Sequence, residues 1–106
     1  MLKLTVLFRS GAPEGMLARL VVRRTDRAEA PFAMDAYVID QKACFEGSFD
    51  TDAEYVYTLA SYFAGAAVNF EEHGRIYTGN ARPSGCGLPA VRIESGQCIE
   101  IRCEIV

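Results

Sequence analysis

The sequence is poor in the side chains that build metal centres. It has one histidine, His73, and its four cysteines, Cys44, Cys86, Cys98 and Cys103, form no C-x-x-C pair. Zinc sites use cysteine and histidine ligands at close, regular spacing, so this pattern argues against a zinc site. The P-loop, G-x-G-x-x-G and H-E-x-x-H motifs are also absent. We therefore predict no metal and no cofactor, and we interpret the cysteines as buried thiols of a reduced, cytoplasmic protein.

Long hydrophobic runs and a strong positive charge are absent as well. No window approaches the roughly 20 apolar residues of a membrane span, and the apolar run between Lys3 and Arg9 is too short for a signal peptide. The formal net charge is -3, which disfavours binding of nucleic acid over the whole surface. We therefore expect neither a membrane nor direct nucleic-acid binding.

The composition that remains is that of one ordinary globular domain. The chain has 106 residues and 50% of them are hydrophobic, so we predict a single domain over residues 1–106 with its own core. Basic residues predominate in residues 1–30 and acidic residues in the rest. Compensation between neighbouring strands explains this asymmetry, and an acidic face that meets a basic partner is the functional alternative.

The first half of the chain has the alternating pattern of β-strands. Apolar and polar residues alternate with period two in several segments, which indicates strands with one buried face. The Leu-Val-Val run and the alternating arginines favour a strand over a helix in residues 16–24, although a helix stays open there. The strands predicted in this half cover residues 2–9, 16–24, 32–40 and 43–50.

The middle of the chain has the features of a helix. Thr51 and Glu54 have the Ser/Thr-x-x-Glu spacing of a capping box, and Asp50 and Asp52 add negative charge at the helix start. Apolar residues then recur at steps of three and four, which is typical of a buried helical stripe. The stripe consists of Tyr55, Val56, Leu59, Tyr62, Phe63 and Ala66. We predict a helix over about residues 51–67.

Strands return after this helix. Period-two patterns predict strands at residues 68–72 and 75–79 with a turn at His73-Gly74, and a C-terminal hairpin centred on Gly96. The hairpin register that keeps one face apolar pairs Ile93 with Ile99, Val91 with Ile101 and Arg92 with Glu100. The predicted fold class is therefore α+β. It has a mostly antiparallel sheet of six to eight strands, four before and four after one central helix that packs on one face.

A reactive thiol is one candidate for chemistry. Cys86 lies between Gly85 and Gly87, and His73 is the available base. The glycines are equally typical of a loop, and no known catalytic signature surrounds the cysteine. We therefore predict no catalytic residues, and a thiol-dependent enzyme using Cys86 remains a weaker alternative.

Acidic and tyrosine side chains are the candidates for a binding surface. Tyr57 falls outside the apolar stripe and is expected to be partly exposed, and Tyr77 is expected on the outer face of its strand. Exposed tyrosines beside carboxylates suit a protein–protein surface. Glu71 and Glu72 are adjacent, so on a strand they point to opposite faces. The predicted partner-binding residues are Glu46, Asp50, Asp52, Tyr57, Glu71, Glu72 and Tyr77.

Two segments carry a resemblance to a known family. FEGSFDTDAEYVYTLASYF (45–63) and VRIESGQCIEIRCEIV (91–106) have the order of a strand, a helix and a terminal Gly-centred hairpin. In this order the chain resembles small bacterial immunity proteins of the WapI-immunity type. The resemblance implies a cytoplasmic protein that neutralises its partner by tight binding and has no catalysis of its own.

The leading hypothesis is a non-enzymatic protein-binding domain. It would be an inhibitor or immunity-like factor of a bacterial or phage conflict or defence system, and it would act by occluding a toxin or a defence-complex subunit. The alternative is a small-ligand-binding domain with a pocket between the helix and the sheet. A homodimer through the C-terminal strand is also open, because that strand has a regular apolar face.

Overall fold

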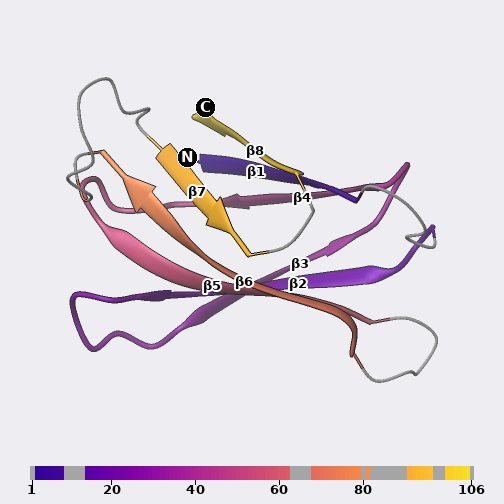
Figure 1. Cartoon of the computed structure of the whole chain (residues 1–106), viewed down its shortest axis with the longest axis horizontal. Helices are drawn as coiled ribbons and strands as arrows, with labels where there is room; N and C mark the ends of the chain where they lie inside the picture. Colours follow the sequence, from indigo (N-terminus) through magenta and orange to yellow (C-terminus); the bar gives the residue numbers. More distant parts are fainter. Residues whose placement is uncertain are drawn as a thin grey trace.

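The protein is built from strands, as its computed structural model shows (Figure 1). The structure describes residues 2–8, 14–62, 68–79, 81, 91–96 and 100–105, and these residues contain eight strands and no helix. The strands are β1 (Leu2–Leu7), β2 (Leu17–Arg24), β3 (Phe32–Tyr37), β4 (Lys42–Gly47), β5 (Glu54–Tyr62), β6 (Val68–Thr78), β7 (Val91–Ser95) and β8 (Glu100–Ile105).

The strands form two antiparallel sheets that pack face to face. One sheet has the order β4-β1-β8 and the other has the order β3-β2-β5-β6-β7. In Figure 1, β1, β4 and β8 lie on one side of the crossing strands β2, β3, β5 and β6. β3 passes into β4 through a two-residue turn at Asp40 and Gln41, whose φ angles are 52° and 61°. Two positive φ angles are the mark of a type I′ turn, which joins the two sheets at one corner.

The core lies between the sheets. Every second residue of β1 is buried, beginning with Leu2, and β2 shows the same alternation. The alternating side chains of the two inner faces therefore meet, as in other sheet-on-sheet packings. Within the described part of the chain, the largest fully buried apolar side chains are Phe45, Leu59, Ile76, Val6, Val22 and Val38.

The strands predicted in the first half of the chain are confirmed. Residues 2–9, 16–24 and 32–40 contain β1, β2 and β3, and residues 43–50 contain all of β4 but its first residue, Lys42. The segment for which a helix was open, residues 16–24, is strand β2. Its buried residues are Ala18, Leu20, Val22 and Arg24.

The helix predicted over residues 51–67 is wrong, and with it the α+β fold class. The described part of this segment is strand β5, and Thr51 and Asp52 form the turn before it. Tyr55, Tyr57, Leu59 and Ser61 of β5 are buried in alternation, and Ala60 on the other face is buried as well. The residues between them are also partly apolar, so the sequence satisfies a helical and a strand period at once. The segment pairs with β2 on one side and with β6 on the other, and these two ladders stabilise the strand. Its aromatic and β-branched side chains also favour a pleated surface.

Two predictions about the second half are also wrong. The turn at His73-Gly74 does not exist, because β6 runs unbroken through both residues. The C-terminal hairpin does not form either, because β7 pairs with β6 and β8 pairs with β1. Ile93 lies opposite Ile76, and Ile101 lies opposite Val6. The apolar residues that argued for a hairpin are partly buried in two different sheets instead.

Candidate functional site

The edge strand β3 is the most exposed strand in the described structure. It pairs with β2 on one side and ends the five-stranded sheet on the other. All six of its residues are exposed or half-buried, whereas β2 buries every second residue. Large apolar side chains take part in this exposure: Phe32 is 37% exposed, and Tyr37 and Ile39 are each 65% exposed. We call Phe32–Ile39 the open edge.

Aromatic packing fixes the start of the open edge. The ring centroids of Phe32 and Phe49 are 5.7 Å apart, and those of Phe49 and Tyr55 are 5.1 Å apart with edge-to-face geometry. Such pairs add to the burial of their apolar area. Phe32 is therefore held in place by the core of the protein while more than a third of it stays accessible.

The open edge carries little charge. The charged residue within β3 is Asp35, and the Arg19 guanidinium binds it with two hydrogen bonds of 2.7 and 3.0 Å. These hydrogen bonds hold the pKa of Asp35 below its usual range. β3 has no lysine, no proline and no break in its register with β2. Lysine, proline and β-bulges are features that protect edge strands from pairing with other chains. Because β3 has none of them, its free edge is available for pairing.

The opposite edge of the same sheet, β7, is better protected. It has five residues, and Arg92 and Glu94 form an ion pair with an N–O distance of 3.5 Å. A short, charged edge strand is a poor template for a further strand. The two edges of the five-stranded sheet therefore differ, and of the two only β3 combines low charge with exposed aromatic residues.

A buried arginine lies at the end of β2. The Arg24 guanidinium donates hydrogen bonds of 2.8 Å to both carboxylate oxygens of Asp26 and a further one to Asp50, and it lies 5.8 Å from the centre of the Tyr55 ring. We call these four residues the Arg24 cluster. The hydrogen bonds to Asp26 raise the pKa of Arg24 and lower the pKa of Asp26. The loops on either side are thereby tied to the sheet.

A second polar group lies deeper, between the sheets. Glu72 on β6 is completely buried, and the Ser95 hydroxyl of β7 donates a hydrogen bond to its Oε1 atom. The Tyr57 hydroxyl lies nearby and donates to the carbonyl oxygen of Glu94 at 3.5 Å. Burial raises the pKa of Tyr57, and the nearby carboxyl of Glu72 raises it further. We call Glu72, Ser95 and Tyr57 the Glu72 cluster.

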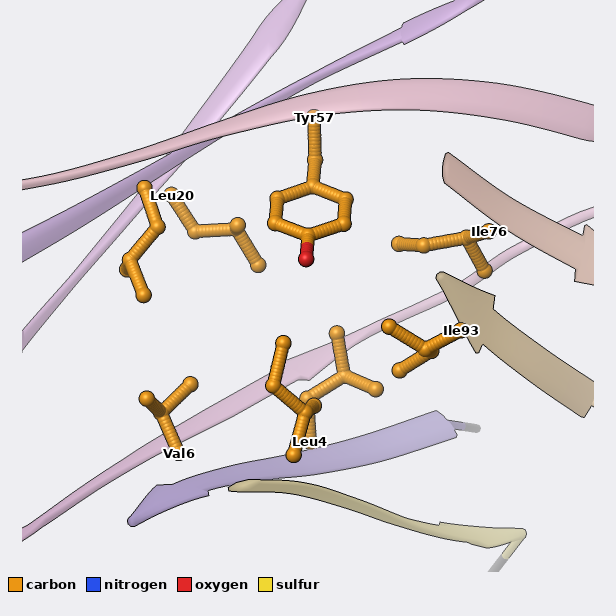
Figure 2. A pocket seen from close by; sticks show the side chains of 8 residues that line it. Leu4, Val6, Leu20, Tyr57, Ile76 and Ile93 are labelled. Carbon is orange, nitrogen blue, oxygen red and sulfur yellow. The ribbon is translucent and has the colours of Figure 1, made fainter. Parts of the chain in front are cut away.

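Between the described strands, the centre of the interior has little empty space. The cavity at its centre has a volume of about 10 Å³. Figure 2 shows the Tyr57 ring descending from β5 toward Leu4 and Val6 of the other sheet, with Leu20 to one side. A cavity of this size has room for one water molecule at most. The helix that the small-ligand alternative required is also absent from the described residues.

The acidic residues that were predicted to bind a partner lie apart. Glu46 is exposed on the outer face of the three-stranded sheet. Glu71 is exposed on the outer face of the five-stranded sheet, where the His73 Nε2 atom lies 2.6 Å from its Oε1 atom. Asp50 belongs to the Arg24 cluster, and Asp52 is exposed in the turn before β5. These residues do not form one acidic surface.

The remaining three predicted residues are buried. Tyr57, expected to be partly exposed, lies in the core, and Glu72 lies beside it. Tyr77 is also buried, and its hydroxyl donates to the Glu94 carboxylate at 3.4 Å. The prediction that Glu71 and Glu72 point to opposite faces is confirmed, since one is exposed and the other buried.

The described residues do not show a cysteine and a histidine placed together as the thiol hypothesis requires. Cys86 lies outside the described residues. The proposed base, His73, is exposed, and its Nδ1 atom lies 3.1 Å from the Thr58 hydroxyl. In the described part of the chain, no three histidine, cysteine, aspartate or glutamate side chains are grouped so that they could hold a metal ion.

Sequence reasoning missed the open edge. Phe32, Tyr37 and Ile39 fall in the strand predicted over residues 32–40, whose apolar pattern is weaker than that of its neighbours. That weakness is the available signal: a strand with apolar residues but no clean alternation has no single buried face. The lack of alternation distinguishes the edge strand β3 from the alternating strands β1 and β2.

Comparison with known protein families, curated proteins and solved structures finds no match. The resemblance to immunity proteins of the WapI-immunity type therefore stays a prediction. No helix of the described residues is long and apolar enough to cross a membrane.

Proposed function

We propose that this chain is a non-enzymatic protein-binding domain and that its binding element is the open edge. The observation that supports this proposal is the exposure of Phe32 and Tyr37 on a strand with one unpaired side in the described structure, with Ile39 exposed just beyond the end of that strand. Phe32 and Tyr37 lie at the two ends of this strand, and exposed aromatic side chains are enriched at protein–protein interfaces.

The binding mode that this edge suits is addition of a strand. An extended segment that pairs with β3 gains main-chain hydrogen bonds, and its side chains alternate between the two faces of the sheet. On the inner face they would contact Phe32 and Met34, and on the outer face they would lie beside Tyr37. Backbone pairing supplies affinity in this mode, and the aromatic side chains supply specificity.

Photo-crosslinking in the source cells tests the proposal. A photoreactive phenylalanine analogue at Tyr37 is expected to form protein adducts that mass spectrometry identifies. The same analogue at Glu46, an exposed position on the other sheet, is the control and also represents the acidic surface predicted from the sequence. Adducts at Glu46 without adducts at Tyr37 would move the binding site to that surface and contradict the open edge.

The narrower function, an inhibitor or immunity-like factor that occludes a toxin or defence-complex subunit, rests on the sequence resemblance and belongs to the same proposal. Identification of the crosslinked partner decides it. A cytoplasmic location is part of the proposal too. It is supported by Cys44 and Cys103, which are free, because thiols stay reduced in that compartment.

A further inference from the structure

A hydroxyl, an imidazole and a carboxylate lie in line on the outer face of the five-stranded sheet. Thr58 of β5 and His73 of β6 are directly opposite each other in the ladder. The Thr58 hydroxyl lies 3.1 Å from the His73 Nδ1 atom, and the Glu71 Oε1 atom lies 2.6 Å from the Nε2 atom of the same ring. We infer that Thr58 is a site of covalent modification, which accepts an acyl group from an activated ester or thioester. The site lies two strands away from the open edge and is independent of the proposed function.

The two hydrogen bonds of the imidazole have a defined direction. A carboxylate accepts hydrogen bonds, so His73 donates from Nε2 to Glu71. In the neutral ring the lone pair is then on Nδ1, which accepts the hydrogen bond from the Thr58 hydroxyl. A hydroxyl that donates to a base, with the base oriented by a third group, is the arrangement of an activated nucleophile.

Strand pairing holds these three groups in place. β5 pairs with β2 on one side and with β6 on the other. Glu71 and His73 are two residues apart on β6, so their side chains lie on the same face. Thr58 is half-buried, whereas 65% of the His73 side chain and 48% of the Glu71 side chain are exposed. The reacting groups are therefore ordered by the sheet and open to a donor in solution.

A positive charge lies within reach of the reacting carbonyl group. Val21 of β2 is directly opposite Thr58, and Arg23 is the next residue of β2 on the same face. Diagonal neighbours in a sheet are about 7–8 Å apart, a distance that a long side chain spans. Arg23 is exposed, so its guanidinium can bind the carbonyl oxygen as negative charge develops on that atom.

Acyl transfer to Thr58 needs no reagent besides the acyl donor. The Oγ atom of Thr58 attacks the carbonyl carbon, and a new Oγ–C bond replaces the bond from that carbon to the leaving sulfur or oxygen atom. His73 accepts the hydroxyl proton at Nδ1 and passes it to the leaving thiolate or phenolate. The products are a Thr58 ester and a free thiol or phenol. Each chain takes up one acyl group, so the chain is modified and does not turn over a substrate.

Acetylation by para-nitrophenyl acetate tests the site. Cys44→Ala serves as the background for all variants, because an exposed thiol also reacts with aryl esters. Mass spectrometry of peptides follows the acetyl group on each hydroxyl over time. Thr5 is the matched control in the same chain, because it is half-buried on the outer face of the other sheet and pairs with Arg102 and Cys44 instead of a histidine. We expect acetylation of Thr58 to be about a hundredfold faster than that of Thr5, since a positioned general base contributes at least this much.

Variants of the other two groups separate the chemistry from the structure. His73→Gln keeps a polar side chain but has no base, so it should lower the rate at Thr58 to the rate at Thr5. Glu71 is a positioning residue, and Glu71→Asp should retain more of the rate than Glu71→Gln because it keeps the carboxylate that orients the imidazole. Circular dichroism checks that each variant is folded.

The outcomes distinguish this site from the open edge. Selective acetylation of Thr58 that is lost in His73→Gln supports the inference. Equal rates at Thr58 and Thr5, or an unchanged rate at Thr58 in His73→Gln, overturn it. The photoreactive analogue at Tyr37 is read out separately, so failure at Thr58 leaves the proposed function standing.

Discussion

Arg24 and Glu72 are both buried in the five-stranded sheet, but their polar groups are satisfied in different ways. Arg24 lies at the end of β2, and its partners Asp26 and Asp50 are 50% and 64% exposed. Glu72 lies between the sheets, and its hydrogen-bond donor is the hydroxyl of Ser95 on the neighbouring strand. A buried charge at the end of a sheet can draw on solvated carboxylates of the loops. A buried carboxyl in the middle depends on strand pairing to supply its donor.

The largest effect is expected from added volume in the Glu72 cluster. A Cβ atom at Gly74 would lie 2.1 Å from the carbonyl oxygen of Glu94 and 2.5 Å from the Tyr57 hydroxyl. Gly74→Ala should therefore lower the free energy of unfolding by about 3 kcal/mol in urea titrations. Gly47→Ala is the control, because its nearest contact is the flexible end of Met34 at 3.1 Å. Equal losses for both variants would contradict the close fit at Gly74.

Loss of the donor to Glu72 should have the next largest effect. Ser95→Ala removes the hydroxyl that binds Oε1, and a buried acceptor without its donor costs about 1–3 kcal/mol. Glu72→Leu together with Ser95→Ala removes both partners, so the double variant should recover part of this loss. Ser48→Ala at an exposed position serves as the control in the same urea titration. If the double variant loses the sum of the two single losses, the two residues do not act as a pair.

Removal of the charge from the Arg24 cluster should cost less. In Arg24→Met the aspartates are released to water, to which they are already half exposed, so no buried group loses its partner. The midpoint of thermal unfolding should fall, but by less than in Ser95→Ala. Arg23→Met, at the exposed neighbouring position, should leave the midpoint nearly unchanged. A larger fall for Arg24→Met than for Ser95→Ala would reverse the comparison.

Acid should weaken the Arg24 cluster. The hydrogen bonds from Arg24 hold the pKa of Asp26 below its ordinary value of 3.8. A carboxylate with a lowered folded pKa stabilises the protein above the unfolded pKa, and this contribution is lost as the pH falls through the folded value. Stability measured between pH 6 and pH 2 should therefore decline less steeply in Asp26→Asn. In an Arg24→Met background the same substitution should change the decline little, and a full effect there would exclude Arg24 as the cause.

Alkali should weaken the packing of β8 by the smallest amount. Burial raises the pKa of the Cys103 thiol to about 11 from its ordinary value of 9.0. The protonated thiol is thus favoured by folding, so stability is complete below pH 9 and declines as the pH rises toward 11. Cys103→Ala should flatten this decline in urea titrations at pH 8 to 11. Cys44→Ala is the matched loss of an exposed thiol, and an equal flattening there would contradict burial as the cause.

Local pattern sufficed for β1 to β4 but not for β5. In β1 the residues between Leu2, Leu4 and Val6 include Lys3 and Thr5, so period two has no competitor. In β5 six of the nine residues are apolar or aromatic, and Tyr55, Val56 and Leu59 also fit a helical stripe. The strand is selected by pairing with β2, from a distant part of the chain, and with β6, the next strand. A capping-box spacing cannot outweigh two complete ladders.

The candidate site could be predicted only in part for the same reason. The opposite orientations of Glu71 and Glu72 follow from strand geometry alone. Which of them is buried depends on Leu59, which lies opposite Glu72 in the neighbouring strand. Exposure of Tyr37 likewise depends on β3 being the last strand of its sheet, a property of the topology and not of the local sequence.

The position of β1 has a consequence for how the protein is made. β1 is the central strand of its sheet, and Leu4 lies between Phe45 of β4 and Cys103 of β8. One side of β1 can therefore be covered midway through synthesis, but the other side waits for the last strand of the sequence. Contacts between such distant segments form slowly, and an unpaired strand edge is a site of misassembly in the meantime. We expect one edge of β1 to stay unpaired in the nascent chain until β8 has left the ribosome.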